Sequence, residues 1–472
     1  MNTSESKGTR PNILLVMVDQ MAYDCIGALG HSVVKTPHLD QLADRSIRFR
    51  TAYCNNPLCA PSRACFFAGR YSHQIRVWDN AAEFSSALPT INHFLRHSGY
   101  QTVGAGKMHF VGPDQLHGFH RRLTPDVFPE DFSWNSLWSK GVGYNAGANV
   151  SKVKGASVVV WDDQYDFDEH AISESERFLL RESARPDPAP FFLTVSLAHP
   201  HPPFHALREE WEAYEGCEIP LPKVPRPSFD HPFDRWTHEQ LGTSRWILED
   251  EEVERARRAY YAMVSYIDKG VGRLLTALEN AGLQEKTAVI FTSDHGELLG
   301  EHGLWFERSY HEESLRVPLL ISLPGASSGG RDSSEVCSLV DLSRTIVELG
   351  GASSVSRELS RWPGRVLLPE LSQERRAAPY ALFEYSGKGV LHPMVGVRRG
   401  DLKFVHVHQE SPLLFDLSED PQETNNLAFE GNRKGDMQQL AALIPDSWDG
   451  ERLQREIETS QRDREVIRTL SG

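Results

Sequence analysis

Short runs of apolar residues alternate along the chain with longer stretches in which apolar residues recur every three or four positions. The runs are continuous, which is typical of strands that are buried on both faces of a sheet. The stretches between them have the periodicity of helices that bury one face. We therefore predict an α/β fold with a large, mixed but mostly parallel sheet sandwiched by helices. The clearest predicted strands are 12–18, 191–198, 288–292 and 318–322.

Two helices can be placed with their boundaries. In 36–46, Thr36 can cap the helix, and Pro37 occupies the first helical position, where its missing N–H is tolerated. In 251–280, apolar residues follow helical spacing over the whole segment. Both are expected to pack on the sheet.

Two long segments, 113–166 and 220–249, lack any such periodicity. The first accumulates Gly, Trp and Asp, and the second is rich in Pro and His. Loops of this length are usually functional lids or disordered linkers. Because both contain aromatic residues, we expect ordered lids.

The pattern changes near residue 378. Segments 394–399 and 402–408 flank an Arg-Gly-Asp turn and are predicted to pair as a hairpin. The charged segment 450–470 is predicted to be a helix. We expect a catalytic α/β domain over residues 1–377 and a small C-terminal α+β domain with an antiparallel sheet over residues 378–472.

Composition narrows the class of protein. The 472 residues include 50 Lys and Arg against 65 Asp and Glu, a formal net charge of −15, and 40% are hydrophobic. Such a chain is soluble and globular, and its charge argues against nucleic-acid binding. Six cysteines are too few for a disulfide framework. Residues 1–10 are polar and no apolar run is long enough to span a membrane, so we expect a cytoplasmic protein without a membrane partner.

Two pairs of polar residues follow predicted strands. Asp19-Gln20 ends the first strand, and Asp294-His295 ends a later one. Ligands of open α/β sheets bind outside the carboxyl ends of strands, so both pairs should face one crevice. Carboxylate, amide and imidazole groups together suit a hard or borderline divalent ion. Taken separately, each Asp could equally be a turn or helix-capping residue.

A third feature is Cys59-Ala60-Pro61-Ser62-Arg63. Pro61 can occupy a first helical turn, which would place Cys59 at a helix N-terminus that stabilises an anion. Arg63 could direct its guanidinium at the same anion. Two other interpretations stay open: Cys59 is a small buried apolar residue, or it is a thiolate nucleophile whose pKa the helix lowers.

The segment from Cys59 to Arg70 resembles the signature of type I, formylglycine-dependent sulfatases of the alkaline phosphatase superfamily. The resemblance covers nearly the whole chain and is nearest to the choline sulfatases. Other matching segments are 19–20, 78–84, 106–118, 199–201, 293–296, 303–305, 420–423 and 425–427.

The resemblance implies an alkaline-phosphatase-like fold and oxidation of Cys59 to formylglycine by a formylglycine-generating enzyme. The hydrated aldehyde would attack sulfur and form a covalent hemisulfate, which its second hydroxyl then releases. A divalent metal ion would assist, calcium in the first place, with manganese and magnesium as alternatives. The implied metal ligands are Asp19, Gln20, Cys59, Asp294 and His295.

Four further catalytic residues follow from the same resemblance. Arg63 would hold the hydrate and the metal side of the site, and His109 would orient the nucleophile and assist its collapse. Lys107 and His201 would contact the sulfate and the leaving-group oxygen, with His201 as the general acid. Taken singly, each could be a surface or loop residue, but their shared order along the chain favours a site.

The substrate side resembles the family less closely. Trp134 matches an aromatic that packs on a quaternary ammonium, and Asn80 and Glu384 match polar contacts near it. However, Tyr144 stands where a His is usual, and Lys388 where an acidic residue is expected, which would disfavour choline.

A second departure lies nine residues before Arg316, where the family usually has a sulfate-binding Lys and this chain has Glu307. A carboxylate there would repel a sulfate, unless Arg308 supplies the missing charge.

The leading hypothesis is a cytoplasmic, homo-oligomeric sulfatase acting on a small organic sulfate ester, of a choline-sulfate-like or zwitterionic kind. The first alternative is a phosphonate monoester hydrolase or phosphodiesterase of the same superfamily. The second is a catalytically impaired relative that binds ligands, for which Glu307 is the best argument.

Overall fold

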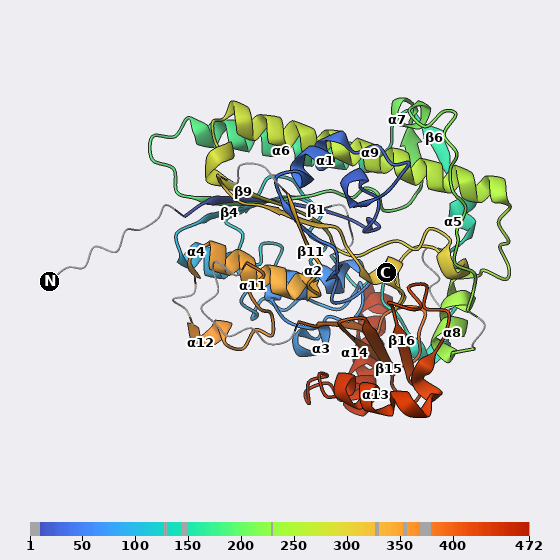
Figure 1. Ribbon diagram of the computed structural model, residues 1–472. Helices are drawn as coiled ribbons and strands as arrows, with labels where there is room; N and C mark the ends of the chain where they lie inside the picture. The colour runs from blue at the N-terminus through green and yellow to red at the C-terminus, as the bar shows by residue number, and fades with distance from the viewer. Residues whose placement is uncertain are drawn as a thin grey trace.

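The computed structural model describes residues 10–126, 128, 130–143, 149–227, 230–325, 330–352, 356–368 and 379–471. Within these residues, eight strands form one large sheet that lies between two layers of helices (Figure 1). In spatial order the strands are β11 (Arg331–Ser333), β2 (Ile47–Phe49), β10 (Leu319–Ser322), β9 (Thr287–Ser293), β1 (Asn12–Val18), β7 (Phe191–Ser196), β4 (Gln101–Gly106) and β5 (Arg121–Arg122).

The central strands are parallel, and the sheet is mixed because of β10. β1 pairs in parallel with β7 and with β9, whereas β10 runs antiparallel to both β9 and β2. Alternate residues of β1 enter two different cores: Ile13 and Leu15 pack on one face, and Leu14 and Val16 on the other. This double burial explains why the strand is continuously apolar.

Helices cover both faces of the sheet. α1 (Pro37–Ala43), α6 (Asp163–Ser183) and α9 (Asp250–Asn280) lie on one face, and α2 (Cys59–Ala68), α4 (Ile91–His97) and α11 (Leu339–Leu349) on the other (Figure 1). The other α-helices described before β13 are α3 (Ser72–Ile75), α5 (Ser151–Lys154), α7 (Arg208–Glu212), α8 (Pro232–Leu241), α10 (Glu312–Leu315) and α12 (Ser356–Leu359). Two small parallel pairs join β3 (Ala52–Tyr53) to β12 (Cys337–Ser338) and β6 (Ser157–Val159) to β8 (His205–Leu207).

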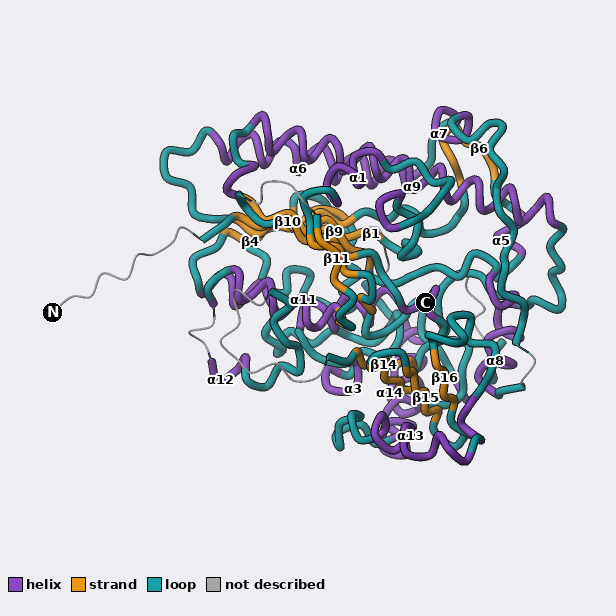
Figure 2. The backbone as a smooth tube through the Cα atoms, viewed as in Figure 1, coloured by secondary structure: helices purple, strands orange, loops and turns teal. Residues whose placement is uncertain are grey.

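A second sheet lies beside the first assembly. Its antiparallel strands are β13 (Ala381–Tyr385), β14 (Met394–Arg399), β15 (Leu402–Val407) and β16 (Leu413–Asp416). Figure 2 shows it next to α13 (Lys434–Ala441) and α14 (Gly450–Ser471), away from the large sheet. The predicted boundary between residues 377 and 378 lies outside the described residues.

The predicted α/β architecture, with a large mixed sheet and a small antiparallel sheet, is confirmed. The strand at 12–18, the hairpin and the C-terminal helix are present nearly as predicted. The segment 220–249 was expected to be irregular, but it contains α8, which His231 caps and Pro232 begins. Such a cap followed by proline was a usable signal.

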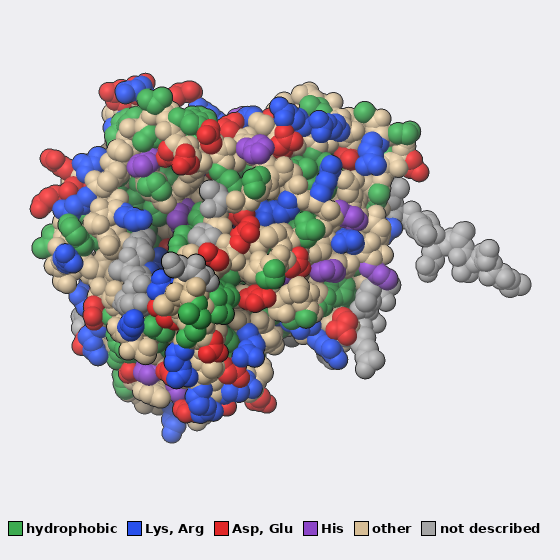
Figure 3. Space-filling view, turned by 180° about the vertical axis from the view of Figure 1, so that it is seen from behind, with side chains coloured by type: hydrophobic (Ala, Val, Ile, Leu, Met, Phe, Trp, Pro, Cys, Tyr) green, Lys and Arg blue, Asp and Glu red, His purple; other side chains and the backbone are tan. Residues whose placement is uncertain are grey.

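In the described part of the chain, no helix combines the length and apolarity needed to cross a membrane. On the face shown in Figure 3, acidic and basic side chains are interspersed.

Candidate active site

The carboxyl ends of β1 and β9 bring two pairs of polar residues together. Because these strands are parallel neighbours, Asp19-Gln20 and Asp294-His295 leave the sheet at the same edge. The Asp294 carboxylate links the pairs, since its Oδ1 accepts the backbone N–H of Gln20 at 3.0 Å and of His295 at 2.9 Å. The crevice expected from the sequence thus lies at this edge.

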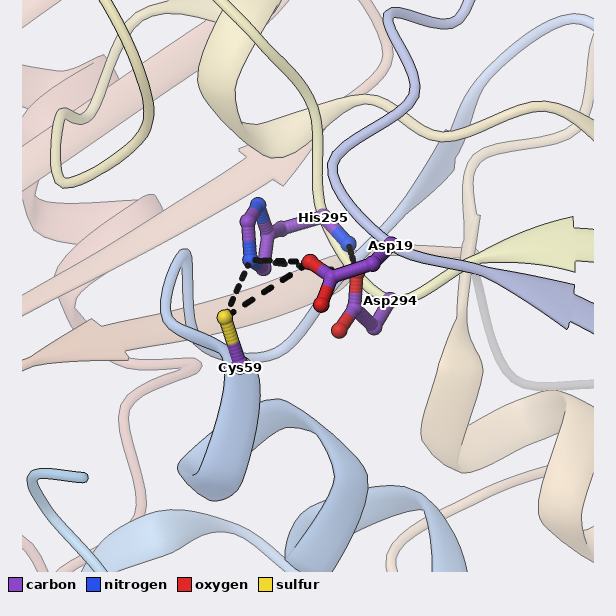
Figure 4. A group of neighbouring side chains, drawn as sticks. All are labelled: Asp19, Cys59, Asp294 and His295. Atoms are coloured by element: carbon purple, nitrogen blue, oxygen red, sulfur yellow. Dashed lines mark hydrogen bonds and ion pairs between the residues drawn. The ribbon is translucent and has the colours of Figure 1, made fainter. Parts of the chain in front are cut away.

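Cys59 is the first residue of α2 and points its thiol at the same group (Figure 4). Its Sγ lies 3.2 Å from Nε2 of His295 and 3.6 Å from Oδ1 of Asp19. The ligand atoms of Asp19, Cys59, Asp294 and His295 all lie within 4.8 Å of one another, and all four residues are buried. Burial, followed by the nearby Asp294 carboxylate, raises the pKa of the thiol well above its usual value. A buried thiol with a raised pKa stays protonated, which argues against the thiolate interpretation.

The start of α2 is held by Asn80. Its Oδ1 accepts the backbone N–H of Ala60 at 3.0 Å, which satisfies one of the free donors at the helix N-terminus. The helix ends where Gly69 adopts a left-handed conformation with φ of 61°, which a residue without Cβ tolerates. Asn80 therefore fixes the position of Cys59 from the side of the predicted substrate site.

Arg63 lies one turn further along α2, with its guanidinium fully buried. Its Nε donates to Oδ2 of Asp294 at 2.7 Å, and its Nη1 donates to the backbone oxygen of Lys107 at 2.6 Å and to Oγ of Ser196 at 2.7 Å. Its Nη2 lies 3.9 Å from Oδ2 of Asp19. Arg63 thus connects α2 by hydrogen bonds with the ends of β9, β4 and β7, and by the longer ion pair with the end of β1.

The group fits a divalent metal ion. The amide nitrogen of Gln20 donates to Oε2 of Glu297 at 2.5 Å, and this hydrogen bond fixes the orientation of the amide. The other side, Oε1, is buried and has no hydrogen-bond partner in the described part of the chain. A cation would satisfy this oxygen together with the carboxylates of Asp19 and Asp294. Nothing in the sequence distinguishes Glu297 as part of this site, although it stands only three residues after Asp294.

Lys107 and His109 directly follow β4, and they approach the site from the carboxyl end of that strand. Nζ of Lys107 forms an ion pair with Oδ2 of Asp19 and lies 3.5 Å from the ring centroid of Phe128. Oδ2 of Asp126 accepts the backbone N–H of His109 at 2.9 Å and so fixes this turn. His109 is buried, and neither ring nitrogen has a hydrogen-bond partner among the described residues. Burial, and then the charge of Lys107, lowers its pKa well below the usual value.

The two histidines after β7 have different surroundings. His199 is buried against Asp168, with Nδ1 and Oδ2 2.7 Å apart. His201 donates from Nδ1 to the backbone oxygen of Pro202 at 2.6 Å, and its ring lines the space above Cys59. Burial, and then Lys107, lowers the pKa of His201 to about 3. A carbonyl oxygen can only accept, so the neutral ring carries its proton on Nδ1 and a lone pair on Nε2.

A cavity of about 430 Å³ opens over Cys59. Of the residues predicted to bind substrate, Asn80, Trp134 and Arg308 line it, together with the catalytic candidate His201. The remaining lining residues are Leu58, Ser136, Lys152, Pro202, Glu307 and Lys388. Lys152 was not found from the sequence, where nothing distinguishes it from a surface lysine.

Glu307 points into this cavity beside Arg308. Oε1 of Glu307 accepts from Nε of Arg308 at 2.6 Å, and Nη1 of Arg308 donates to Oε1 of Gln240 at 3.1 Å. Burial alone would raise the pKa of the Glu307 carboxyl, but Arg308 and the nearby histidines hold it below its usual value. Arg308 adopts φ of 81°, an unfavourable value for a residue with a Cβ. A charged carboxylate and guanidinium thus occupy the wall where the family usually has a lysine.

Glu384 does not reach the cavity. Its Oε2 accepts the backbone N–H of His73 at 2.9 Å, and its Oε1 lies 2.5 Å from Nδ1 of the same residue. It is buried and is absent from the cavity wall, so the structure gives no support to its predicted contact with substrate. Tyr144 lies outside the described residues.

A second group of metal-type ligands comprises His302, His311 and Glu423, all buried. The two rings stack with centroids 3.5 Å apart and only 12° between their planes. A metal ion lies in the plane of an imidazole ring that binds it, about 2 Å from the nitrogen. Because these two rings are stacked in parallel planes, they cannot both bind the same ion. Oε1 of Glu423 already lies 2.6 Å from Nζ of Lys403. This group is therefore an ion-paired contact between α10 and the small sheet.

Comparison with known proteins agrees with this geometry. Residues 11–352 match the model of the Sulfatase family, and residues 300–446 match that of the C-terminal part of N-sulphoglucosamine sulphohydrolase. The fold and site define a sulfuric ester hydrolase with an alkaline-phosphatase-like fold. The chain belongs to the sulfatase family.

Several relatives match over most of their length. A choline-sulfatase of Rhizobium meliloti (strain 1021) is 38% identical over 474 residues, covering 97% of this chain and 91% of the relative. An arylsulfatase of Clostridium perfringens is 29% identical and covers 89% of this chain and 90% of its own. Among solved structures, the phosphonate monoester hydrolase of Agrobacterium radiobacter superimposes with a TM-score of 0.71 at 22% identity, covering 95% of this chain and 96% of its own. At that identity the similarity extends to the fold alone.

Proposed function

We propose that the protein hydrolyses the sulfate ester of a small organic molecule, with residue 59 as the position of the nucleophile. The observation that carries the proposal is the convergence of Cys59 with Asp19, Asp294 and His295 in a chain of the sulfatase family. The unpartnered Oε1 of Gln20 supports a cation in their midst.

Two groups would supply the central chemistry. Formylglycine formed from Cys59 would provide a hydrated aldehyde as nucleophile, and a divalent ion held by Asp19, Gln20, Asp294 and His295 would lower the pKa of its hydroxyl. Calcium is the first candidate for an oxygen-rich set, with manganese and magnesium as alternatives.

The remaining residues would position the reacting groups. Arg63 holds Asp294 and the strand ends in place through its three short hydrogen bonds. Lys107 and Arg308 bring positive charge to the sulfate, which offsets the repulsion from Glu307. His109 is buried with both ring nitrogens available and would hold the hydroxyl of the nucleophile.

His201 lines the cavity and would face the leaving group. Since its Nδ1–H is committed to the backbone oxygen of Pro202, Nε2 can only accept a hydrogen bond while the ring is neutral. The role of general acid predicted for it therefore needs a second proton on the ring, which a bound sulfate would favour by its negative charge.

The test combines maturation with turnover. The protein is produced with and without a formylglycine-generating enzyme, the peptide containing residue 59 is examined by mass spectrometry, and sulfate release from 4-nitrophenyl sulfate is followed. We expect turnover to rise with the fraction of aldehyde and to vanish in Cys59→Ala. Unmodified thiol in fully active enzyme would refute the proposal.

A second candidate is hydrolysis of phosphonate monoesters or phosphate diesters, and Glu307 is the observation that favours it. The carboxylate stands where a sulfate-binding lysine is usual, so it weakens the case for sulfate alone. Comparing kcat/KM for an aryl sulfate, a phosphate diester and a phosphonate monoester separates the two activities. If fully modified protein turned over none of them, it would be a catalytically impaired relative that binds ligands.

A further inference from the structure

The cavity over Cys59 is larger than a sulfate group requires. Its volume of about 430 Å³ falls in the range of roughly 300–1,000 Å³ that is usual for sites binding small organic molecules. The alcohol released by hydrolysis must occupy the part that leads from Cys59 to the surface. The side chains along that part therefore determine which alcohol fits.

Three cations line the cavity in order of increasing exposure. Arg308 is buried, Lys388 is half-buried, and Lys152 is exposed. The charge of Arg308 acts on Cys59 and on Lys388. Lys388 also feels the charges of Glu307 and Lys152, which act on it in opposite directions. Positive charge thus extends from the floor of the cavity to its mouth.

This charge is only partly balanced by the protein. Glu307, the carboxylate in the cavity wall, accepts from Arg308. For Lys388 and Lys152, no carboxylate of the described residues lies within 4.0 Å. Lys154 provides the contrast: it follows Lys152 by two residues, and its Nζ lies 3.2 Å from Oε2 of Glu252.

The position of Lys388 is built into the turn that carries it. The backbone oxygen of Lys388 accepts from Oη of Tyr385 at 2.5 Å, and that of Gly387 accepts from Nε1 of Trp138 at 3.0 Å. Burial, and then the charge of Arg308, lowers the pKa of Lys388 to about 7. A half-buried ammonium without a counter-ion is costly, and an anion brought by a ligand would remove that cost.

A cationic leaving group finds no such partner. Trp134, which is 40% exposed, could cover an ammonium, and its ring already packs edge-on against His109 at 5.5 Å between centroids. The lysines near the mouth would repel a quaternary ammonium, and Glu307 is already paired with Arg308. The local charge therefore disfavours choline as the leaving group and favours a leaving group with negative charge.

We propose that the substrate is a sulfate ester whose leaving group carries a second anionic group, a carboxylate or a further sulfate, bound by Lys388 and Lys152. This inference rests on the proposed hydrolysis of sulfate esters and specifies the substrate class. It assigns a leaving-group subsite to two lysines on α5 and on the turn after β13, with Trp134 as the apolar wall.

Binding tests the inference independently of turnover. Metal-loaded Cys59→Ala protein is titrated calorimetrically with 4-(sulfooxy)benzoate, 4-nitrophenyl sulfate and choline O-sulfate. We expect the carboxylate-bearing ester to bind at least about tenfold more tightly than the other two, as hydrogen bonds to a charged group allow. Lys388→Gln and Lys152→Gln should remove that preference, whereas the matched control Lys154→Gln should keep it.

The outcomes distinguish the inference from the function. Equal binding of all three esters, tighter binding of choline O-sulfate, or a preference that survives Lys388→Gln would overturn the subsite. In active enzyme, the lysine variants should raise KM for 4-(sulfooxy)benzoate about tenfold while kcat and the turnover of 4-nitrophenyl sulfate stay within about threefold. Selective binding without turnover of any ester would uphold the subsite and reject the proposed hydrolysis.

Discussion

Arg464 in the C-terminal helix α14 forms two hydrogen bonds with the carboxylate of Asp79, at 2.6 Å from Nη1 to Oδ1 and at 2.8 Å from Nη2 to Oδ2. Both residues are buried. Asp79 directly precedes Asn80, whose side chain holds the first turn of the helix that begins at Cys59. The last helix of the chain therefore supports the position of the candidate nucleophile.

The same helix supports the loop that carries Trp134, another residue of the cavity wall. The Gln461 side chain accepts the backbone N–H of Trp138 at 2.9 Å, and its backbone oxygen accepts from Nδ2 of Asn135 at 2.9 Å. These bonds fix the loop that carries Trp134. The C-terminal segment thus contributes to the site without reaching the reacting atoms.

We predict that Arg464→Met destabilises the protein and lowers its activity. Removing one partner of a buried ion pair leaves the other charge unpaired, which costs about 3–5 kcal/mol. The melting temperature should fall, and kcat/KM should fall with it at temperatures where the variant is still folded, because Asn80 loses its support.

The matched control is Arg462→Met. Arg462 lies on the same helix, is exposed, and donates only to Oγ1 of Thr459 among the bonds described for it. Its variant should melt like the wild type. Equal melting temperatures for the two variants would show that the pair with Asp79 contributes nothing to stability.

Much of this fold follows from local pattern. The continuous apolar run at 12–18 becomes β1 because both of its faces are buried. α1 starts at Pro37 with Thr36 in the N-cap position, but the Thr36 side chain makes no capping hydrogen bond. The strand at 319–322 was equally visible, but its antiparallel direction beside β9 depends on the connection between them, which periodicity does not encode.

The site divides in the same way. The metal and nucleophile positions could be predicted, because they stand at strand ends or at a helix start and belong to the sulfatase signature or to segments that resemble the family. These residues are Asp19, Cys59 and Asp294. The substrate side could be predicted only in part: the sequence points to Lys388, which lines the cavity, but nothing in it distinguishes Lys152, which reaches the cavity from a segment far away in the chain. Glu384 resembled a binding residue but folds against His73. Only tertiary packing decides such positions.

We predict that Glu297→Gln weakens metal binding. Oε2 of Glu297 accepts from the Gln20 amide, and its Oε1 accepts the backbone N–H groups of Leu299 at 2.9 Å and Phe306 at 2.6 Å. An amide cannot accept on both sides, so Gln20 would turn its own NH₂ group toward the ion. Loss of such a supporting contact typically costs about 10–100-fold in metal affinity.

Competition with a fluorescent chelator measures the affinity, and chelation of the wild type should abolish turnover until calcium, manganese or magnesium is returned. Glu301→Gln serves as the control, because Glu301 also accepts two backbone N–H groups, those of Lys223 and Val224, away from the site. An equal affinity in both variants would argue that Glu297 does not orient Gln20.

We predict that Asp234 makes the protein less stable as the pH rises. Burial raises the pKa of its carboxyl to about 7, and the charge of Glu423 raises it as well. The hydrogen bond from Tyr310 and the charges of His302 and Arg226 lower it only in part. The folded state then holds a proton that the unfolded chain releases near pH 4. The stability it contributes is complete below about pH 4 and is lost as the pH rises toward 7, by roughly 2–4 kcal/mol.

Asp234→Asn removes this titration while keeping the shape of the side chain and a partner for Tyr310. Unfolding by urea at pH 5 and pH 8 should show a gain in stability over the wild type that is clearly larger at pH 8 than at pH 5. An equal difference at both pH values would contradict a raised pKa for Asp234.

We predict that Glu307→Gln raises kcat/KM for an ordinary sulfate monoester by roughly tenfold, which corresponds to about 1.4 kcal/mol of removed repulsion. The amide keeps the shape of the side chain and still accepts from Arg308, whose positive charge would then no longer be neutralised and could attract the sulfate.

The control is Glu384→Gln, another buried carboxylate, which lies outside the cavity wall and should leave KM unchanged. If kcat/KM for the sulfate fell in Glu307→Gln alone, the carboxylate would be required to hold Arg308 in its unfavourable backbone conformation. Glu307 would then be part of the substrate-binding apparatus and no longer an obstacle to it.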